Sequence, residues 1–304
     1  MRILSSLLAI GTAIGLSAAT ATPALAGQGQ GQGQTCSPEF VQSSQTVTVT
    51  GLEIGTNAPT SENFQVRLRN DGNGQCGAAL RVARLSTSPS SDLAFILRSG
   101  GSVFDILPTE TSPGTTSSDV YVPGISGGTN GRALPFVLTV PGEWGMAAGT
   151  RQEQLLLSLI GTDGTVFDTM ILNIVIDVPP SVELRIVGVT GNNEIAGINL
   201  GTLDPQAVNV SDPFGVRIWS TSPYSVTFQS DHMGKLAHDS LGDTIPYKLR
   251  MNGSLVDLKG GQATQFGTRT DSLGDLHPLE VTVDPFTARA GDYSDRVLVT
   301  VTAS

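Results

Sequence analysis

The sequence is short of charge, aromatic residues, histidine and cysteine. Charged residues make up 14% and aromatic residues 5% of the 304 residues, with three His and two Cys, whereas charged residues are about 25% of typical globular chains. The net charge is −10 and no cluster of Lys or Arg occurs, which argues against nucleic acid and anionic membranes as partners. Because apolar residues still make up 39%, the composition predicts folded domains and not a disordered chain.

Long apolar runs are also scarce, and the clearest one lies at the N-terminus. Residues 3–19 are rich in Leu, Ile and Ala, follow Arg2, and precede the small-x-small site Ala24-Leu25-Ala26. This pattern predicts a secretory signal peptide over residues 1–26. A membrane anchor is the alternative, but Ser and Thr interrupt the run, which is short for a span. Residues 27–35, mostly a Gly–Gln repeat, are predicted to be a flexible leader.

Cys36 and Cys76 are the two cysteines. An even pair in an exported chain predicts a structural disulfide. The 41-residue loop that it would close corresponds to about 4 kcal/mol in the chain-entropy treatment. Metal binding by the pair is disfavoured because no C-x-x-C spacing or clustered His accompanies it.

Apolar residues alternate at period two in short segments separated by Gly, Pro, Asn, Asp and Ser. Such segments include Phe64/Val66/Leu68, Val182/Leu184/Ile186 and Val297/Val299/Val301. No stretch shows a sustained helical period. The pattern predicts an all-β protein built from immunoglobulin-like Greek-key sandwiches.

An internal repeat predicts two domains. Residues 138–159 resemble residues 281–301, and Phe64-Gln-Val66-Arg67-Leu68 resembles Phe214-Gly-Val216-Arg217-Ile218. Two copies of one sandwich explain this self-similarity. We expect an N-terminal domain over 36–178, a stiff Pro-Pro linker at 179–180, and a C-terminal domain over 181–304.

The two copies differ in how they end. In the first, the strand at 155–160 is followed by a hairpin signal and a further apolar run at 166–178. In the second, the equivalent strand at 297–303 leads to Ser304. The C-terminal sandwich is therefore predicted to lack its last strand and to need a strand from another chain. The open trough is expected beside two alternating segments: Val182, Leu184, Ile186 and Val297, Val299, Val301.

The second copy resembles the spore coat protein U domain family, whose members include subunits of archaic (Csu-type) chaperone–usher pili. The resemblance is carried by 290–295 (Ala-Gly-Asp-Tyr-Ser-Asp) with the terminal Val/Thr strand, and by weaker similarities at 200–203, 224–226 and 245–251. It implies an incomplete immunoglobulin-like domain that a periplasmic chaperone holds, that an outer-membrane usher assembles, and that the donor strand of the next subunit completes.

The resemblance also implies a place at the pilus tip. Shaft subunits begin with an alternating apolar donor segment, whereas residues 27–34 here are Gly and Gln. A chain that accepts a strand but gives none resembles a two-domain tip adhesin, exported through the periplasm to the cell surface, where it would support attachment and biofilm formation. An exported coat or matrix protein with the same fold is the alternative, and a secreted hydrolase is a third. The bound surface or receptor stays open.

Candidate contact residues are apolar side chains within the Gly-rich loops of the N-terminal domain: Ile125, Leu134, Phe136, Trp144 and Met146. An exposed apolar group of this kind would form a binding patch. The alternative is that Phe136 continues the strand of Leu138 and Val140 and that Trp144 belongs to the core. Tyr293, just ahead of the last strand, is predicted to form the tyrosine corner of a Greek-key sandwich, which is a structural role.

Catalytic and metal motifs are weak. Residues 124–128 fit G-x-S-x-G, but no helix signal follows, as that nucleophile turn requires. His232 and His238 are six residues apart, but a solvated loop accounts for them better than a metal site does. We predict no enzyme activity, no cofactor and no metal.

Overall fold

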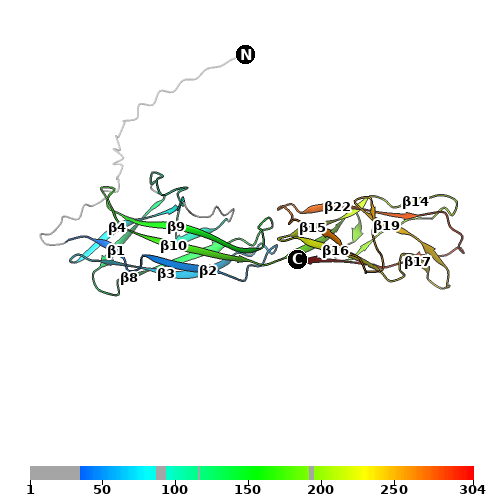
Figure 1. The fold of residues 1–304 in the computed structure, drawn as a ribbon, viewed down its shortest axis with the longest axis horizontal. Helices are drawn as coiled ribbons and strands as arrows, with labels where there is room; N and C mark the ends of the chain where they lie inside the picture. Colours follow the sequence, from blue (N-terminus) through cyan, green and yellow to red (C-terminus); the bar gives the residue numbers. More distant parts are fainter. Residues whose placement is uncertain (1–34, 87–93, 116, 192–194) are drawn as a thin grey trace, which may run out of the picture. The chain divides into compact units, whose positions relative to one another are not determined.

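The computed structural model describes residues 35–86, 94–115, 117–191 and 195–304. The predicted signal peptide and nearly all of the leader lie outside the described residues. The described residues form strands and turns without a helix, so the all-β prediction is confirmed (Figure 1). No helix among them is long and apolar enough to cross a membrane.

The first of two sheets in the N-terminal sandwich is antiparallel at every strand pair. Its strands, in spatial order, are β1 (Pro38–Phe40), β3 (Thr60–Asn70), β8 (Arg132–Val140), β5 (Ile96–Ser99) and β6 (Ser102–Val103). Strands β3 and β8 form its centre, with Phe64 opposite Phe136. Because side chains alternate along a strand, Val66, Leu68, Phe136 and Leu138 all reach the interior.

The second sheet contains the long strand that closes this sandwich. Its order is β2 (Ser44–Val49), β10 (Val166–Val178), β9 (Gly149–Ile160), β4 (Gln75–Arg84) and β7 (Asp119–Ser126). Strand β10 is antiparallel to β9 and parallel to β2, so both of its edges are hydrogen-bonded. Five apolar side chains of β10 point inward and are buried: Met170, Leu172, Ile174, Ile176 and Val178.

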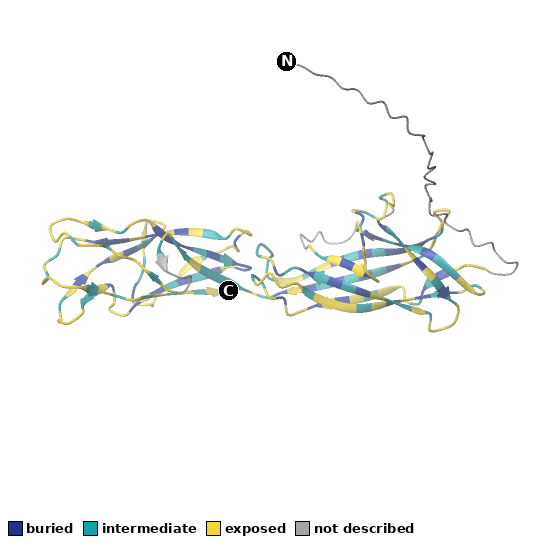
Figure 2. Ribbon diagram, turned by 180° about the vertical axis from the view of Figure 1, so that it is seen from behind, coloured by how far each residue is buried: buried dark blue, intermediate teal, exposed yellow. Residues whose placement is uncertain are grey.

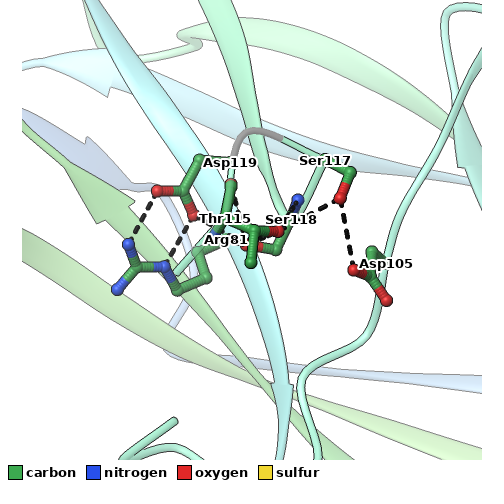
Figure 3. A network of polar contacts seen from close by, with 6 residues as sticks. All are labelled: Arg81, Asp105, Thr115, Ser117, Ser118 and Asp119. Carbon is green, nitrogen blue, oxygen red and sulfur yellow. Dashed lines mark hydrogen bonds and ion pairs between the residues drawn. The ribbon is translucent and has the colours of Figure 1, made fainter. Parts of the chain in front are cut away.

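A single apolar core lies between these two sheets, and Figure 2 shows buried residues alternating with exposed ones along the strands. A segment that begins at Phe104, itself a core residue, runs along the edge of β4 that faces away from β9, where Leu107 pairs with Ala83 and both are buried. The polar network in Figure 3 fixes its return to β7. Arg81 donates two hydrogen bonds to Asp119, at 2.6 and 2.7 Å, and the Thr115 backbone N donates to Ser118 Oγ at 2.7 Å.

The C-terminal sandwich has a second core that shares no residue with the first. Its six-stranded sheet, among the described residues, contains β11 (Val182–Val187), β15 (Phe214–Ser220), β22 (Asp275–Val283), β19 (Lys248–Met251) and β20 (Ser254–Leu255), with β14 (Asn209–Val210) beside β22. Its three-stranded sheet is ordered β21 (Thr264–Phe266), β16 (Tyr224–Ser230) and β24 (Val297–Ala303).

Two small sheets complete this sandwich. One is ordered β18 (Thr244–Pro246), β17 (Lys235–His238) and β23 (Tyr293–Ser294), and the other pairs β12 (Thr190–Gly191) with β13 (Ala196–Gly197). Both are short, and neither pairs with β24 in the described part of the chain.

The two sandwiches have matching strand orders. The order β1-β3-β8-β5-β6 corresponds to β11-β15-β22-β19-β20, and β9-β4-β7 corresponds to β24-β16-β21. The residues of the internal repeat fall on matching strands: Phe64 and Phe214 lie in β3 and β15, and Leu155 and Val297 begin the parts of β9 and β24 that pair with β4 and β16. The described residues of the C-terminal sandwich contain no counterpart of β2 or β10 beside β24.

Candidate functional site: an open groove beside strand β24

Strand β24 is the edge of its sheet within the described residues. It pairs antiparallel with β16, with Val299 opposite Phe228, and with no other strand. Its inward side chains Val297, Val299 and Val301 are only partly buried, whereas the equivalent side chains of β9, the strand next to β10, are fully buried. The difference in burial marks the place where β10 lies in the N-terminal sandwich.

Strand β11 forms the other lip of this opening. It pairs with β15 on one side only and approaches β24 across the sandwich. Val182, Leu184 and Ile186 are partly buried and pack against the second core. All six groove residues predicted from the sequence therefore flank the core at incompletely covered positions.

An apolar cavity of about 160 Å³ lies between the two lips. Ile186, Val297 and Val299 line it together with core side chains that include Phe228 and Leu249. Val182, Leu184 and Val301 do not line this cavity. An unpaired strand edge next to an apolar opening can accept one further strand by backbone pairing and side-chain burial.

A larger cavity of about 630 Å³ continues the opening beyond the start of β24. Its walls come from residues 198–203 and 288–295, with Pro205, Leu236, Ile245 and Phe286, and it has both polar and apolar lining groups. Ile198 and Asp295 line both cavities. The two cavities therefore meet at these two side chains.

Asp295 is a buried carboxylate, with its side chain 2% exposed. Its Oδ2 accepts hydrogen bonds from Ser230 Oγ at 2.5 Å and Tyr247 Oη at 2.6 Å, and its Oδ1 accepts from the backbone N and ring Nδ1 of His232, both at 3.1 Å. Arg296 N also donates to Oδ1, at 2.9 Å. Burial, followed by the hydrogen bond to Asp295, raises the pKa of Tyr247 above its ordinary value, so its hydroxyl stays a donor.

A buried acid occupies the matching position in the N-terminal sandwich. Glu153 lies two residues before Leu155, as Asp295 lies two before Val297, and it forms an ion pair with Arg84. Arg84 and Ser230 are themselves equivalent, because they pair with Leu155 and Val297. The alternation of side chains along a strand places both acids on the inner face, but it does not show which groups form hydrogen bonds or ion pairs with them.

For two of the five predicted contact residues, Ile125 and Phe136, the prediction of an exposed side chain is wrong. Ile125 is 0% exposed and Phe136 is 1% exposed, and both belong to the first core. Phe136 continues the inward series of β8. Ile125 turns inward because the ladder between β4 and β7 shifts register opposite Gly124, whose φ is +66°, and a bulge of this kind reverses the face on which later residues lie.

The other three predicted contact residues are partly buried. Leu134 and Met146 pack against the first core. The ring of Trp144 covers Gly55, where an added Cβ would lie 2.7 Å from ring atoms. The loop of Trp144 and Met146 precedes Gly149, which pairs with Val178. The loop therefore lies at the end of the sandwich where β10 ends, and the β9–β10 hairpin lies at the opposite end.

The predicted disulfide is not formed in the structure, where Cys36 and Cys76 are both free thiols. The thiols are nevertheless neighbours. Burial, followed by a hydrogen bond with Cys36, raises the pKa of Cys76 to about 12. Tyr293 makes the contact of a tyrosine corner, since its hydroxyl donates to the Arg289 carbonyl at 2.8 Å.

In the described part of the chain, the serine of the G-x-S-x-G motif lies in a paired strand and His277 lies among hydrogen-bond partners in the core. Ser126 lies in β7 opposite Gln75. His277 is buried, accepts from or donates to Tyr224 Oη at 2.9 Å and lies 3.0 Å from Asn252 Nδ2, and burial lowers its pKa below the ordinary value. Across the described ranges, no group of three or more His, Cys, Asp or Glu side chains could hold a metal ion.

No protein-family model matches the sequence, so the resemblance to the spore coat protein U domain family stays a prediction. No curated protein matches it. The chain is similar to the CsuC–CsuE chaperone–tip adhesion subunit pre-assembly complex from archaic chaperone–usher Csu pili of Acinetobacter baumannii, with 16% identity, 88% of this chain and 99% of that chain covered, and a TM-score of 0.43.

Two further solved structures are similar over most of their length. They are CfaE, the adhesive subunit of CFA/I fimbria of enterotoxigenic Escherichia coli, and the CupB6 tip adhesin from Pseudomonas aeruginosa. For CfaE the identity is 14%, the coverage 86% of this chain and 92% of that chain, and the TM-score 0.42. For CupB6 the values are 10%, 88%, 95% and 0.34.

Proposed function

We propose that the chain is the tip adhesin of a chaperone–usher pilus and that its C-terminal sandwich takes up a donor strand from the next subunit. The observation that carries this proposal is the unpaired edge of β24 beside the apolar groove. The N-terminal sandwich is self-complete in this account, because β10 fills the position that is open in the other sandwich. It serves as the adhesive module that attaches the cell to a surface and supports biofilm formation.

The same groove requires a partner before assembly. Four or five buried apolar side chains contribute about 1.5–3 kcal/mol each, or roughly 6–15 kcal/mol together, which is the range of a whole domain's stability. A sandwich without this contribution needs a periplasmic chaperone to cover the groove until an outer-membrane usher presents the donor strand. Export through the periplasm then places the protein at the cell surface.

Strand β10 supplies a template for the test. Residues 161–178 contain the hairpin turn and β10, and they follow Ile160, whose counterpart in β24 is Thr302. We would copy residues 161–178 after Thr302 of the mature chain. The expected result is antiparallel pairing of the copied strand with β24 and a rise in the unfolding temperature of the C-terminal sandwich.

A matched control carries the same extension with its inward residues replaced by Ser: Met170, Leu172, Ile174, Ile176 and Val178. This control keeps the length and the turn but has no apolar side chains for the groove, so the unfolding temperature should stay that of the unextended chain. If both extensions have the same effect, the groove does not accept a strand, and the proposal fails.

A further inference from the structure

The outer face of the sheet β2-β10-β9-β4-β7 carries exposed aromatic side chains near the β9–β10 hairpin. Tyr121 is 60% exposed and Phe167 is 39% exposed. The ladder pairs Val166 with Ile160, Ile160 with Ala79, and Ala79 with Tyr121. These residues therefore form one row across four neighbouring strands, from β10 to β7, and Phe167 lies at the bulge next to Val166.

Each ring lies close to a glycine: Tyr121 to Gly77 of β4, and Phe167 to Gly161 of the turn between β9 and β10. An added Cβ would lie 2.3 Å from Tyr121 Oη at Gly77, and 3.1 Å from Phe167 Cε2 at Gly161. Ile160 faces outward between them but is only 3% exposed, so neighbouring side chains cover it. Between the two aromatic side chains, the accessible part of the row is therefore formed by the small residues Gly77 and Ala79, which are half-buried, and not by Ile160.

Rigid polar groups flank this row on two sides. Two residues farther along β4 and β7, roughly 7 Å away, two hydrogen bonds, at 2.6 and 2.7 Å, join the side chains of Arg81 and Asp119. At the hairpin, Asp163 accepts hydrogen bonds from Thr165 N at 3.0 Å and Thr165 Oγ1 at 2.8 Å. These hydrogen bonds lower the pKa of Asp163, which keeps it an ionised acceptor.

We propose that this row is a binding site for a neutral saccharide. Aromatic rings present an electron-rich face on which the C–H face of a sugar ring packs, and the carboxylates of Asp119 and Asp163 accept hydrogen bonds from hydroxyl groups. The distance across the four strands is about 14 Å, which suits a disaccharide. The proposal deepens the adhesive role proposed above and rests on it.

The charges favour a neutral saccharide over an acidic one. Arg81 is already paired with Asp119, and Asp163 keeps its negative charge. The groups named at the site therefore offer an anion no free cation, and an acidic sugar would meet like charge at the hairpin. A flat hydrophobic surface is the other possible occupant, and it would not use the fixed carboxylates.

The test is a binding titration of the full mature chain with lactose, maltose and cellobiose, and with 3′-sialyllactose as the acidic probe, followed by ligand-observed NMR. We expect at least one neutral disaccharide to bind. Tyr121→Ala and Phe167→Leu should each weaken binding by about tenfold, which corresponds to the contribution of one aromatic contact. Tyr121→Phe keeps the ring and should bind within about threefold of the unchanged chain. Leu273→Ala, an exposed change in the other sandwich, is the matched control and should have no effect.

Three results would overturn the inference. They are no binding of any neutral disaccharide, binding by the Tyr121→Ala and Phe167→Leu variants that is as tight as that of the unchanged chain, and tighter binding of 3′-sialyllactose than of lactose. If adsorption to polystyrene falls in these variants while no disaccharide binds, the row contacts apolar surfaces instead. Donor-strand uptake is measured separately with the 161–178 extension, so disaccharide binding without strand uptake would keep this site and refute the proposed pilus role.

Discussion

Val299→Asp is the sharpest test of the groove. Val299 lines the apolar cavity and lies opposite Phe228, so a strand bound beside β24 would enclose it. In the free chain the position is only partly buried, and the new carboxylate stays in contact with water. We therefore expect the free protein to lose little stability and donor-strand uptake to fail.

The magnitude follows from the protonation of the new group. A buried, unpaired carboxylate becomes neutral, and protonating a group with an ordinary pKa of about 3.9 at pH 7 costs about 4 kcal/mol. Donor-strand binding should weaken by about a thousandfold at pH 7. At pH 5 the same cost is about 1.5 kcal/mol, so the loss should shrink to about tenfold.

The assay measures binding of a synthetic peptide with the sequence of residues 166–178 to the mature chain at both pH values. Leu298→Asp is the matched control, since Leu298 is the adjacent residue of β24 on the exposed face. Val299→Ala separates the loss of the valine side chain from the effect of charge. Equal peptide affinity for Val299→Asp and Leu298→Asp at pH 7 would refute burial of this face by a donor strand.

Three further changes test other parts of the structure. Burial lowers the pKa of His277, so its stabilising contribution is complete above the unfolded pKa of about 6.5 and is lost as the pH falls through the lower folded pKa. Between pH 7 and pH 5, the unfolding temperature of the C-terminal sandwich should therefore decrease more for the unchanged chain than for His277→Gln. An equal decrease in the two proteins would contradict this. Oxidation should join Cys36 and Cys76 and stabilise the first core by up to about 4 kcal/mol, and a titration that finds two thiols in the oxidised, unfolded protein would rule out the bond. Asp295→Asn turns an amide donor toward hydroxyl donors and should destabilise the C-terminal sandwich by about 1–3 kcal/mol in denaturant unfolding, whereas the exposed Asp239→Asn should change little.

Period-two alternation predicted the strands well because it depends only on which side chains face the core. It predicted the inward Val297, Val299 and Val301 and the long run over 166–178. The pairing of strands depends on contacts far apart in the sequence, so the parallel ladder of β2 with β10 could not be predicted from the alternation.

The errors and omissions have local causes. Ile125 was misplaced because a register shift near Gly124 reverses the face of β7, and a register shift leaves only the glycine as a signal in sequence. The buried Asp295 was missed although it continues the inward series of Val297 and Val299, because its partners Ser230 and Tyr247 lie 65 and 48 residues away. The exposed Tyr121 and Phe167 do not meet the criterion used for contact residues, because neither stands in a Gly-rich loop.

The pairing of β10 on both edges also has a mechanical consequence. The chain leaves the N-terminal sandwich at Val178, the end of β10, so tension applied along the chain at this point would pull β10 parallel to its own axis. The ladders to β9 and β2 would then be loaded in shear, with many hydrogen bonds sharing the force at once, instead of opening one at a time. The sandwich should therefore resist extraction of β10, the strand through which the force enters. In single-molecule pulling, the rupture force should be higher when the protein is pulled from Val178 than when it is pulled from a residue of the β9–β10 turn, Gly161–Thr165.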